Sequence, residues 1–293
     1  MKNMNKGILT DADMKKTKYK ILYASMFTGM IVYCLISIVP VIYIMLSGFK
    51  DVKEMYSIPA SFFPKRIDLS KLVRVWNEMK FYKYYGNTFI MALGAVVADV
   101  TISGLAGYVL SALKPKGTRV MLAIIFLIML LPGTMRTVPL YMEFKNMPVI
   151  GINLLESFWP IWIMAGANAF NIILFKNSFD SISHSLVEAA WIDGCSNIKI
   201  FFKIILPLSV PTILVVAMFT FNSQLGQFFW PYLLISNKEM TTIGVQLYKM
   251  KTSSYTMDYQ MIALFFSVIP QIVVFAIFQK QIIGGVNVGG VKG

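Results

Sequence analysis

Residues whose side chains could carry out chemistry are few in this sequence, and they lie far apart. The chain has one histidine, His184, and two cysteines, Cys34 and Cys195. A zinc site or a histidine-based nucleophilic triad needs several such groups close together, and two distant cysteines establish no disulfide framework. The phosphate-binding pattern GxxxxGK followed by Ser or Thr is absent from the sequence. The sequence therefore predicts no catalytic residue and no metal site, and His184 is expected to be a loop residue.

Two charged residues, Asp99 and Arg136, interrupt long apolar runs. A carboxylate at the centre of a bilayer costs roughly 2.5–3.5 kcal/mol, so Asp99 should face other helices or a wet cavity. Arg136 is the obvious counter-charge. At a rise of ~1.5 Å per residue, however, Asp99 is far from the outer end of its helix, whereas Arg136 is near the outer end of the next span. The two charges are therefore expected at different depths in the membrane. Asp99 is therefore expected either to line a path through the membrane or to accept hydrogen bonds from neighbours such as Ser103.

Amide side chains inside apolar runs are further candidates for lining a polar path. Their alternative role is to form hydrogen bonds between helices, which are worth only ~0.6 kcal/mol on average in membranes. The second role is the commoner expectation for each residue taken singly. The candidates are Asn168, Asn171, Asn222, Gln224 and Gln271.

The segment 184–211, HSLVEAAWIDGCSNIKIFFKIILPLSVP, has the most distinctive pattern in the chain. Ser185 and Glu188 match the capping box S-x-x-E, which satisfies free N–H groups at the start of a helix. Gly194 is the residue type best suited to end a helix in a left-handed turn. The sequence therefore predicts a short helix of about two turns that carries the small residues Ala189 and Ala190.

A second helix is predicted to start near Ile198 and to continue into an apolar run. Pro207 and Pro211 lie in its first turns. Each proline removes a backbone N–H donor and crowds the preceding turn, so a bend is expected there.

The elements that would position these residues belong to a membrane protein. The 293 residues are 57% hydrophobic and only 14% charged, whereas a soluble domain usually carries roughly 25% charged residues. Lys and Arg number 27 against 14 Asp and Glu, but they occur in short blocks between apolar runs. The composition therefore nearly excludes a water-soluble enzyme, and no nucleic-acid partner is expected.

Six membrane-spanning helices are predicted, because a bilayer core of ~30 Å needs ~20 apolar residues. After the fifth, an apolar segment rich in Phe and Trp is expected to dip back into the membrane. The predicted chain has a tail at 1–20, one all-α integral-membrane domain at 21–280 with a polar loop at about 181–203, and a second tail at 281–293. The predicted spans are 21–49, 86–113, 120–142, 157–175, 204–222 and 259–279.

A cluster of basic residues beside the first span favours an N-terminus on the cytoplasmic side, since the first helix often sets the topology. Six spans then place the C-terminus and the 181–203 loop on the same side. The cluster consists of Lys15, Lys16, Lys18 and Lys20.

The spacing in the loop resembles the EAA loop of ABC-importer permeases. Glu188-Ala189-Ala190 is followed after three residues by Gly194, and after nine more by Ile204-x-Leu206-Pro207. The remainder of the chain is similar to the binding-protein-dependent permeases of the carbohydrate type, on the maltose-permease G-like side of that family. The similar segments are Asn87-Thr88, Gly107-Tyr108, Leu131-Pro132-Gly133, Pro139-Leu140-Tyr141, Pro160, Phe228-x-Trp230-Pro231 and Gly289-Gly290-Val291-Lys292-Gly293.

The resemblance implies a six-helix type I importer permease in the bacterial cytoplasmic membrane, with a cytoplasmic coupling helix at about 186–193. It implies pairing with a second homologous permease, two ATPase subunits that hold ATP and Mg, and an extracellular solute-binding protein, with no cofactor in this chain. Asp99 could then face the path or the sister permease. The resemblance assigns ATPase coupling to Glu188, Ala189, Ala190, Asp193, Gly194, Leu206 and Pro207.

Other functions stay open at the level of sequence. The EAA loop is shared with amino-acid and peptide importers, and only the flanking pattern favours sugars. An integral-membrane enzyme would need a cluster of reactive groups near one membrane face, where the spans supply only Asp99 and Arg136. An autonomous channel or secondary transporter would leave the loop without a purpose.

Overall fold

The computed structural model describes residues 17–59, 61–148 and 150–286, and these residues form helices and loops without a strand. They divide into two compact units. The first contains the residues up to Val73 together with Tyr255–Phe265, and the second contains Arg74–Ser254 and the residues from Phe266 onward. Each unit is described separately.

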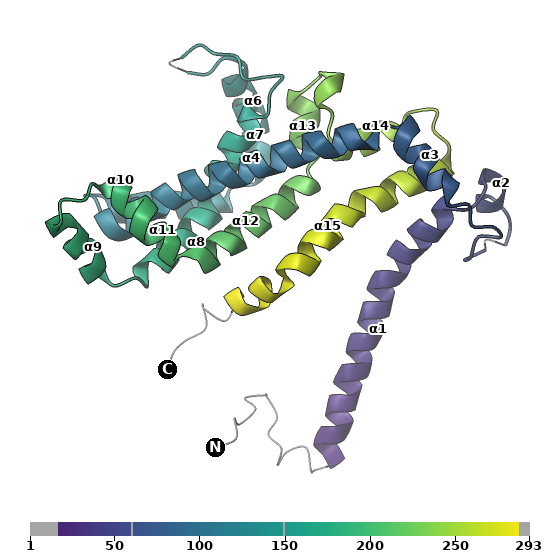
Figure 1. The fold of residues 1–293 in the computed structure, drawn as a ribbon, viewed down its shortest axis with the longest axis horizontal. Helices are drawn as coiled ribbons and strands as arrows, with labels where there is room; N and C mark the ends of the chain where they lie inside the picture. Colours follow the sequence, from purple (N-terminus) through teal and green to yellow (C-terminus); the bar gives the residue numbers. More distant parts are fainter. Residues whose placement is uncertain (1–16, 60, 149, 287–293) are drawn as a thin grey trace. The chain divides into compact units, whose positions relative to one another are not determined.

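The first unit is built around α1, Thr17–Gly48, a long apolar helix (Figure 1). Its side chains are mostly exposed. Its last residue, Gly48, touches the first part of α15, Met257–Val286, since a Cβ there would lie 2.7 Å from Ile262 Cγ1. The short α2, Val52–Met55, follows, and α3, Ser70–Glu78, begins in this unit. Lys71 at the start of α3 donates to the Lys50 carbonyl at 2.9 Å and pairs with Asp258 of α15 at 2.6 Å.

The second unit has α4, Phe81–Tyr108, as its central helix, extended by a π-helical turn at Val109–Leu113. It packs along α7, Trp159–Gly166, α8, Ala169–Asp180, and α12, Val210–Leu225 (Figure 1). Glycines allow the backbones to approach closely, as is common between membrane helices. A Cβ at Gly107 of α4 would lie 2.7 Å from Phe175 Cβ, and one at Gly166 would lie 3.0 Å from the Ala98 carbonyl oxygen.

Further elements complete the structure. They include 3-10 turns at Gly133–Arg136 and Lys238–Met240 and a π-helical turn at Phe201–Ile205. The helices are α5 Thr118–Leu130, α6 Thr137–Lys145, α9 His184–Ile192, α10 Asn197–Ile200, α11 Leu206–Leu208, α13 Phe229–Leu234, α14 Ile243–Met250 and α15 Met257–Val286.

Three helices in the described residues are long and apolar enough to cross a membrane: α1, Phe81–Leu113 and Met257–Gln279. Two bent pairs raise the number to five at most. One pair is α5 with Gly133–Lys145, bent by 103°, and the other is Asn197–Leu208 with α12, bent by 86°. The predicted count of six is therefore not confirmed.

The predicted span at 157–175 differs most from the structure, because it consists of the separate helices α7 and α8. The break lies at Ala167 and Asn168. Asn168 has an extended backbone, and its side chain accepts from the Asn171 N–H at 3.2 Å, so it caps α8 instead of continuing α7. The sixth predicted span extends as α15 to Val286, past the expected boundary at 280.

The expected bend at the two prolines is confirmed. Ser209 lies between them with non-helical angles, φ −106° and ψ 17°, at the 86° break. Pro211 has no N–H to donate to the Pro207 carbonyl four residues earlier, so the helical ladder is interrupted at this point. The Ser209 N–H instead closes a tighter turn onto the Leu206 carbonyl at 3.0 Å.

Candidate functional site

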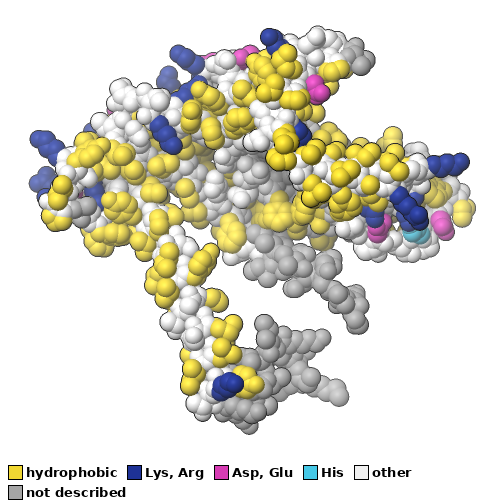
Figure 2. All heavy atoms as spheres, turned by 180° about the vertical axis from the view of Figure 1, so that it is seen from behind, with side chains coloured by type: hydrophobic (Ala, Val, Ile, Leu, Met, Phe, Trp, Pro, Cys, Tyr) yellow, Lys and Arg dark blue, Asp and Glu magenta, His cyan; other side chains and the backbone are white. Residues whose placement is uncertain are grey.

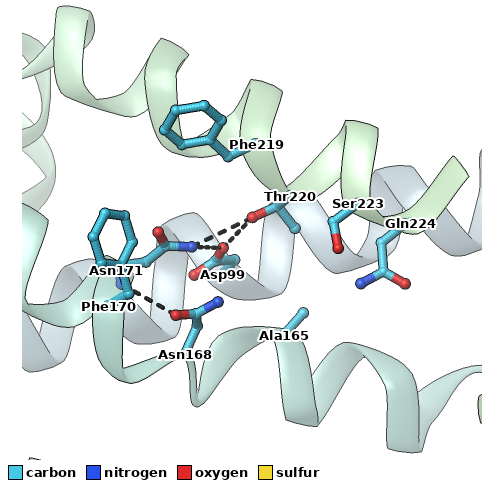
Figure 3. Close-up of a pocket in the computed structure, with 9 residues that line it drawn as sticks. All are labelled: Asp99, Ala165, Asn168, Phe170, Asn171, Phe219, Thr220, Ser223 and Gln224. Atoms are coloured by element: carbon cyan, nitrogen blue, oxygen red, sulfur yellow. Dashed lines mark hydrogen bonds between the residues drawn. The ribbon is translucent and has the colours of Figure 1, made fainter. Parts of the chain in front are cut away.

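Asp99 lies at the centre of a buried polar cluster formed by three helices of the second unit (Figure 3). The side chain is 0% exposed. Its Oδ1 accepts from the Ser103 hydroxyl at 2.7 Å, and its Oδ2 accepts from the Asn171 amide at 2.6 Å and from the Thr220 hydroxyl. The carboxylate thus has donors from α4, α8 and α12. The expectation of hydrogen bonding to Ser103 is confirmed, and Arg136 does not contribute.

The cluster also borders a cavity of about 250 Å³. Figure 3 shows that Asn168 and Ala165 come from one side of this space, while Thr220, Ser223 and Gln224 follow α12 on the other. Three of the predicted path residues besides Asp99 therefore come together here: Asn168, Asn171 and Gln224. Asn222 and Gln271 do not line this cavity.

Asn222 is exposed on α12, and Gln271 on α15 has its Nε2 3.7 Å from the position of a Cβ at Gly226. The sequence analysis did not predict Thr220 and Ser223 as lining residues. They could have been found from Gln224, because residues 220, 223 and 224 lie on one face of a helix.

A second cavity of about 740 Å³ shares Asn168 and Phe170 with the first. Its walls include the bend between α5 and α6, where Arg136 is exposed, and the aromatic side chains of Phe229 and Trp230 on α13. Arg136 has no ion pair within the described part of the chain. The two adjoining cavities thus combine amides, aromatic rings, one buried carboxylate and one cation.

The apolar segment after the fifth predicted span is held by α4. The Asn87 amide donates to the carbonyls of Glu239 at 2.7 Å and Thr241 at 2.9 Å. The neighbouring Thr88 hydroxyl accepts from the Ile243 N–H at 3.0 Å. These contacts fix the connection between α13 and α14 at the start of α4.

Glu156 holds the same connection from the α7 side. Its carboxylate accepts from the backbone N–H groups of Asn237 at 2.9 Å and Ser236 at 2.9 and 3.0 Å. These bonds, that of Asn237 foremost, lower the pKa of the Glu156 carboxyl below its ordinary value, because they favour the charged form.

The segment predicted as a short helix is α9, His184–Ile192, and it ends as expected. Gly194 has a left-handed backbone at φ +74°. The Gly194 N–H bonds to the Trp191 carbonyl at 3.0 Å, and the Cys195 N–H bonds to the Ala190 carbonyl at 2.9 Å. This is the complete Schellman pattern of paired bonds that closes a helix C-terminus.

The predicted capping box is wrong. The helix begins at His184, so Ser183 is the N-cap residue, and it forms no side-chain cap bond. The Ser185 hydroxyl instead lies 2.7 Å from the Ser183 hydroxyl. Glu188 is exposed on the outer face of α9. The S-x-x-E pattern therefore begins at Ser185, two residues after the N-cap residue Ser183, and does not cap the helix.

α9 has one buried and one exposed face. Val187 and Ala190 are buried, whereas Glu188, Ala189, Asp193 and Gly194 are exposed together with Leu186, Trp191 and Ile192. Ile192 is 86% exposed. The exposed apolar side chains Leu186, Trp191 and Ile192, with the small residues beside them, make this face a candidate interaction surface.

The buried face of α9 packs into the same hydrophobic cluster as the ends of α4, α8 and the π-helical turn. Phe201 is at its centre, 5.5 Å from the Tyr108 ring and 6.4 Å from the Phe179 ring between centroids. Leu206 lies against this cluster and Pro207 is exposed at the bend. The helices that carry the Asp99 cluster thus share a core with α9.

No group of three or more His, Cys, Asp or Glu side chains within the described residues could hold a metal ion.

Comparisons with known proteins identify the family. A family described as binding-protein-dependent transport system inner membrane component matches residues 99–287. The chain is 31% identical to the maltodextrin transport system permease protein MdxG of Bacillus subtilis, over 77% of this chain and 81% of that protein. It is 25% identical to the arabinooligosaccharides transport system permease protein AraQ of Halalkalibacterium halodurans, over 96% of this chain and all of that protein.

Among solved structures, the chain is similar to one from a bacterial ABC transporter involved in the import of the acidic polysaccharide alginate. The TM-score is 0.76 at 28% identity, over 90% of this chain and 98% of that one. The family match covers most of the chain, and it includes both the Asp99 cluster and α9. The chain therefore belongs to the family of inner membrane components of binding-protein-dependent transport systems, as a multi-pass permease and not an enzyme.

Proposed function

We propose that this chain forms one half of the path of an ATP-driven importer for an oligosaccharide or related glycan. The observation that carries the proposal is the shared core: the helices around the Asp99 cavity pack in one cluster with α9. Motion of α9 would therefore be transmitted to the helices that line the cavity. The relatives named for maltodextrin and arabinooligosaccharide transport support a glycan as cargo.

The chemistry of the two cavities suits a sugar. Hydroxyl groups need hydrogen-bond partners, which Asn168, Ser223 and Gln224 supply. The apolar faces of sugar rings pack on aromatic side chains, and Phe229 and Trp230 supply these in the adjoining cavity. Pockets in general combine aromatic walls with a few polar groups that fix the orientation of the ligand.

The exposed face of α9 is proposed to dock on an ATPase subunit, with Glu188, Ala189, Asp193 and Gly194 at the contact. Ala190 would act from the other face, because it ties α9 to the core. Leu206 and Pro207 would pass the motion to α12 at the 86° bend. ATP and Mg would be held by the ATPase, and this chain would hold no cofactor.

The proposed assembly contains this chain, a second homologous permease, two ATPase subunits and an extracellular binding protein in the bacterial cytoplasmic membrane. Both termini would lie on the cytoplasmic side with α9, as the lysine cluster beside α1 suggests. The proposed organisation is a tail at 1–20, a permease domain at 21–280 and a tail at 281–293.

Arg136 favours an acidic glycan over a neutral one. It is a permanent cation without a carboxylate partner in the described part of the chain, and it lies in the cavity wall beside the aromatic residues of α13. A guanidinium binds a carboxylate with two parallel hydrogen bonds. The similar alginate importer is also named for an acidic cargo.

The test is uptake by the complete transporter, reconstituted from this chain with a sister permease, an ATPase and a solute-binding protein. Oligogalacturonides, maltooligosaccharides, amino acids and peptides would be compared. ATP-dependent uptake of an oligosaccharide is expected. Uptake of amino acids or peptides alone, or activity of this chain without an ATPase, would overturn the proposal.

Arg136→Gln should lower uptake of the acidic oligosaccharide by about 10- to 150-fold, since a charge-assisted hydrogen bond is worth roughly 1.5–3 kcal/mol. Arg136→Lys should lose less, because the charge is kept. Uptake of a neutral oligosaccharide by the same variants is the control. Equal losses for both cargoes would contradict a role for Arg136 in charge recognition.

A further inference from the structure

A third cavity, of about 630 Å³, lies at the connection between α4 and α5, away from the Asp99 cluster. Lys114 and Arg119 line it from the connection, and Lys176, Asp180 and His184 line it from the end of α8 and the start of α9. In Figure 2 the histidine, in cyan, lies among Lys or Arg and Asp or Glu side chains at the edge of an apolar surface. None of these residues has a role in the proposed path.

The cavity carries uncompensated positive charge. Asp180 is its one carboxylate, and both of its oxygens are occupied. Oδ1 accepts from the Ser111 hydroxyl at 2.6 Å, and Oδ2 pairs with Lys176 at 2.5 Å. Lys114 lies 3.3 Å from His184 Nε2, and neither Lys114 nor Arg119 has an ion pair within the described residues. Lys114 also acts on Asp180 through its charge, but the three cations of the lining, Lys114, Arg119 and Lys176, outnumber its one carboxylate by two, which leaves net positive charge for an anionic ligand.

The position of the cavity selects a lipid as the source of that anion. The apolar helix through Leu113 and α5 are joined by only four residues, so the connection must lie at a membrane surface. Val120, Ile124 and Leu127, at the spacing of one helix face, are 63%, 50% and 61% exposed. A ligand with an anionic head in the cavity could thus lay its acyl chains along α5.

We propose that this cavity binds the phosphate headgroup of an anionic phospholipid. Lys114 and Arg119 contact the phosphate, and the acyl chains follow the exposed face of α5. Basic pockets between membrane helices are a recurring means of binding such headgroups. Because His184 begins α9, the bound lipid also touches the base of the proposed coupling helix.

The test uses the full-length chain, purified in detergent and titrated with phosphatidylglycerol or phosphatidylcholine, with bound lipid counted by native mass spectrometry. Phosphatidylglycerol should bind preferentially. Arg119→Gln should weaken its binding by about fivefold, the usual effect of one basic residue on an anionic lipid. Arg119→Lys should keep most of the binding, which separates loss of charge from misfolding.

The matched control is Lys116→Gln, which removes an exposed charge from the same connection without lining the cavity. It should leave binding unchanged. Equal binding of the two lipids, or equal losses for Lys116→Gln and Arg119→Gln, would overturn a defined site. Displacement of the lipid by an equal concentration of inorganic phosphate would overturn the lipid as the source of the anion. None of these outcomes depends on glycan uptake.

Discussion

At the scale of single residues, the polar groups of the second unit are used in two ways. Asp99 is buried and fully engaged by donors from three helices, whereas Arg136 is exposed to a cavity without a partner among the described residues. The first arrangement holds helices together, and the second is available to a ligand. Sequence alone marked both residues as unusual but did not separate these roles, because the distinction depends on which neighbours converge in space.

Asp99→Asn should destabilise the protein by about 1–3 kcal/mol. The new amide group would face other donors, so at least one buried hydrogen bond would be lost. Thr220→Val, which removes one donor, should cost less, ~0.6–1.7 kcal/mol. Thermal unfolding in detergent measures both. Asn222→Ala, on the same helix as Thr220 but exposed, is the control, and an equal effect for it would contradict the cluster's stabilising role.

Glu156 predicts a pH dependence in the loop that follows α13. Its pKa is lowered in the folded state, so its contribution is complete above the unfolded value of about 4.3 and is lost as the pH falls below it. Glu156→Gln should reproduce the loss at neutral pH. Proteolysis at 235–242, followed with pH, measures this. A pH-independent cleavage rate in the natural protein would contradict the interpretation.

At the scale of elements, prediction succeeded where one residue type decides the backbone. Gly194 ends α9 in a left-handed turn and Pro211 interrupts the helical ladder, and both were expected from residue type alone. It failed at Ser185 and Asn168, where the same side chains fit more than one position. A serine can cap a helix or lie within its first turn, and an asparagine can cap a new helix inside an apolar run. Those choices depend on tertiary packing, which is not visible in a local pattern.

Gly194→Asp should abolish uptake while the protein stays in the membrane. Any side chain at φ +74° strains the turn by roughly 1–2 kcal/mol, and the new charge lies beside the proposed docking face. The effect is measured by two assays, co-purification of the ATPase and substrate uptake. Gly151→Asp, at φ +66° and also in open space, applies similar strain and charge elsewhere. It should leave ATPase binding intact, and normal uptake by Gly194→Asp would exclude the coupling role.

Adjacent alanines on α9 allow a direct test of which face docks. Ala189 is exposed and Ala190 is buried. With Cys34 and Cys195 replaced by serine, Ala189→Cys should crosslink to an ATPase subunit and Ala190→Cys should not. Crosslinking through both positions, or through neither, would show that α9 does not bind the ATPase through this face.

At the scale of the whole molecule, the membrane class was predictable, whereas the number of spans was not. Composition and the long apolar runs suffice for α1, α4 and α15, which are continuous. The other runs contain prolines or a capping asparagine and form bent or separate helices, so run length overestimates the number of straight spans. Family membership came from the loop spacing and is confirmed by the match over residues 99–287.

The close glycine contacts along α4 limit where the protein can change shape. At Gly107 and Gly166, α4 lies so close to its neighbours α8 and α7 that no side chain fits between the helices. If the helices slid along each other, side chains would have to enter these contacts and would clash with the backbone. These helices are therefore expected to move together as one body, and the helix breaks at Ser209 and near Pro132 are the candidate hinges. Spin labels placed within that body should keep constant separations throughout a transport cycle, while pairs that straddle either hinge should show two distance populations.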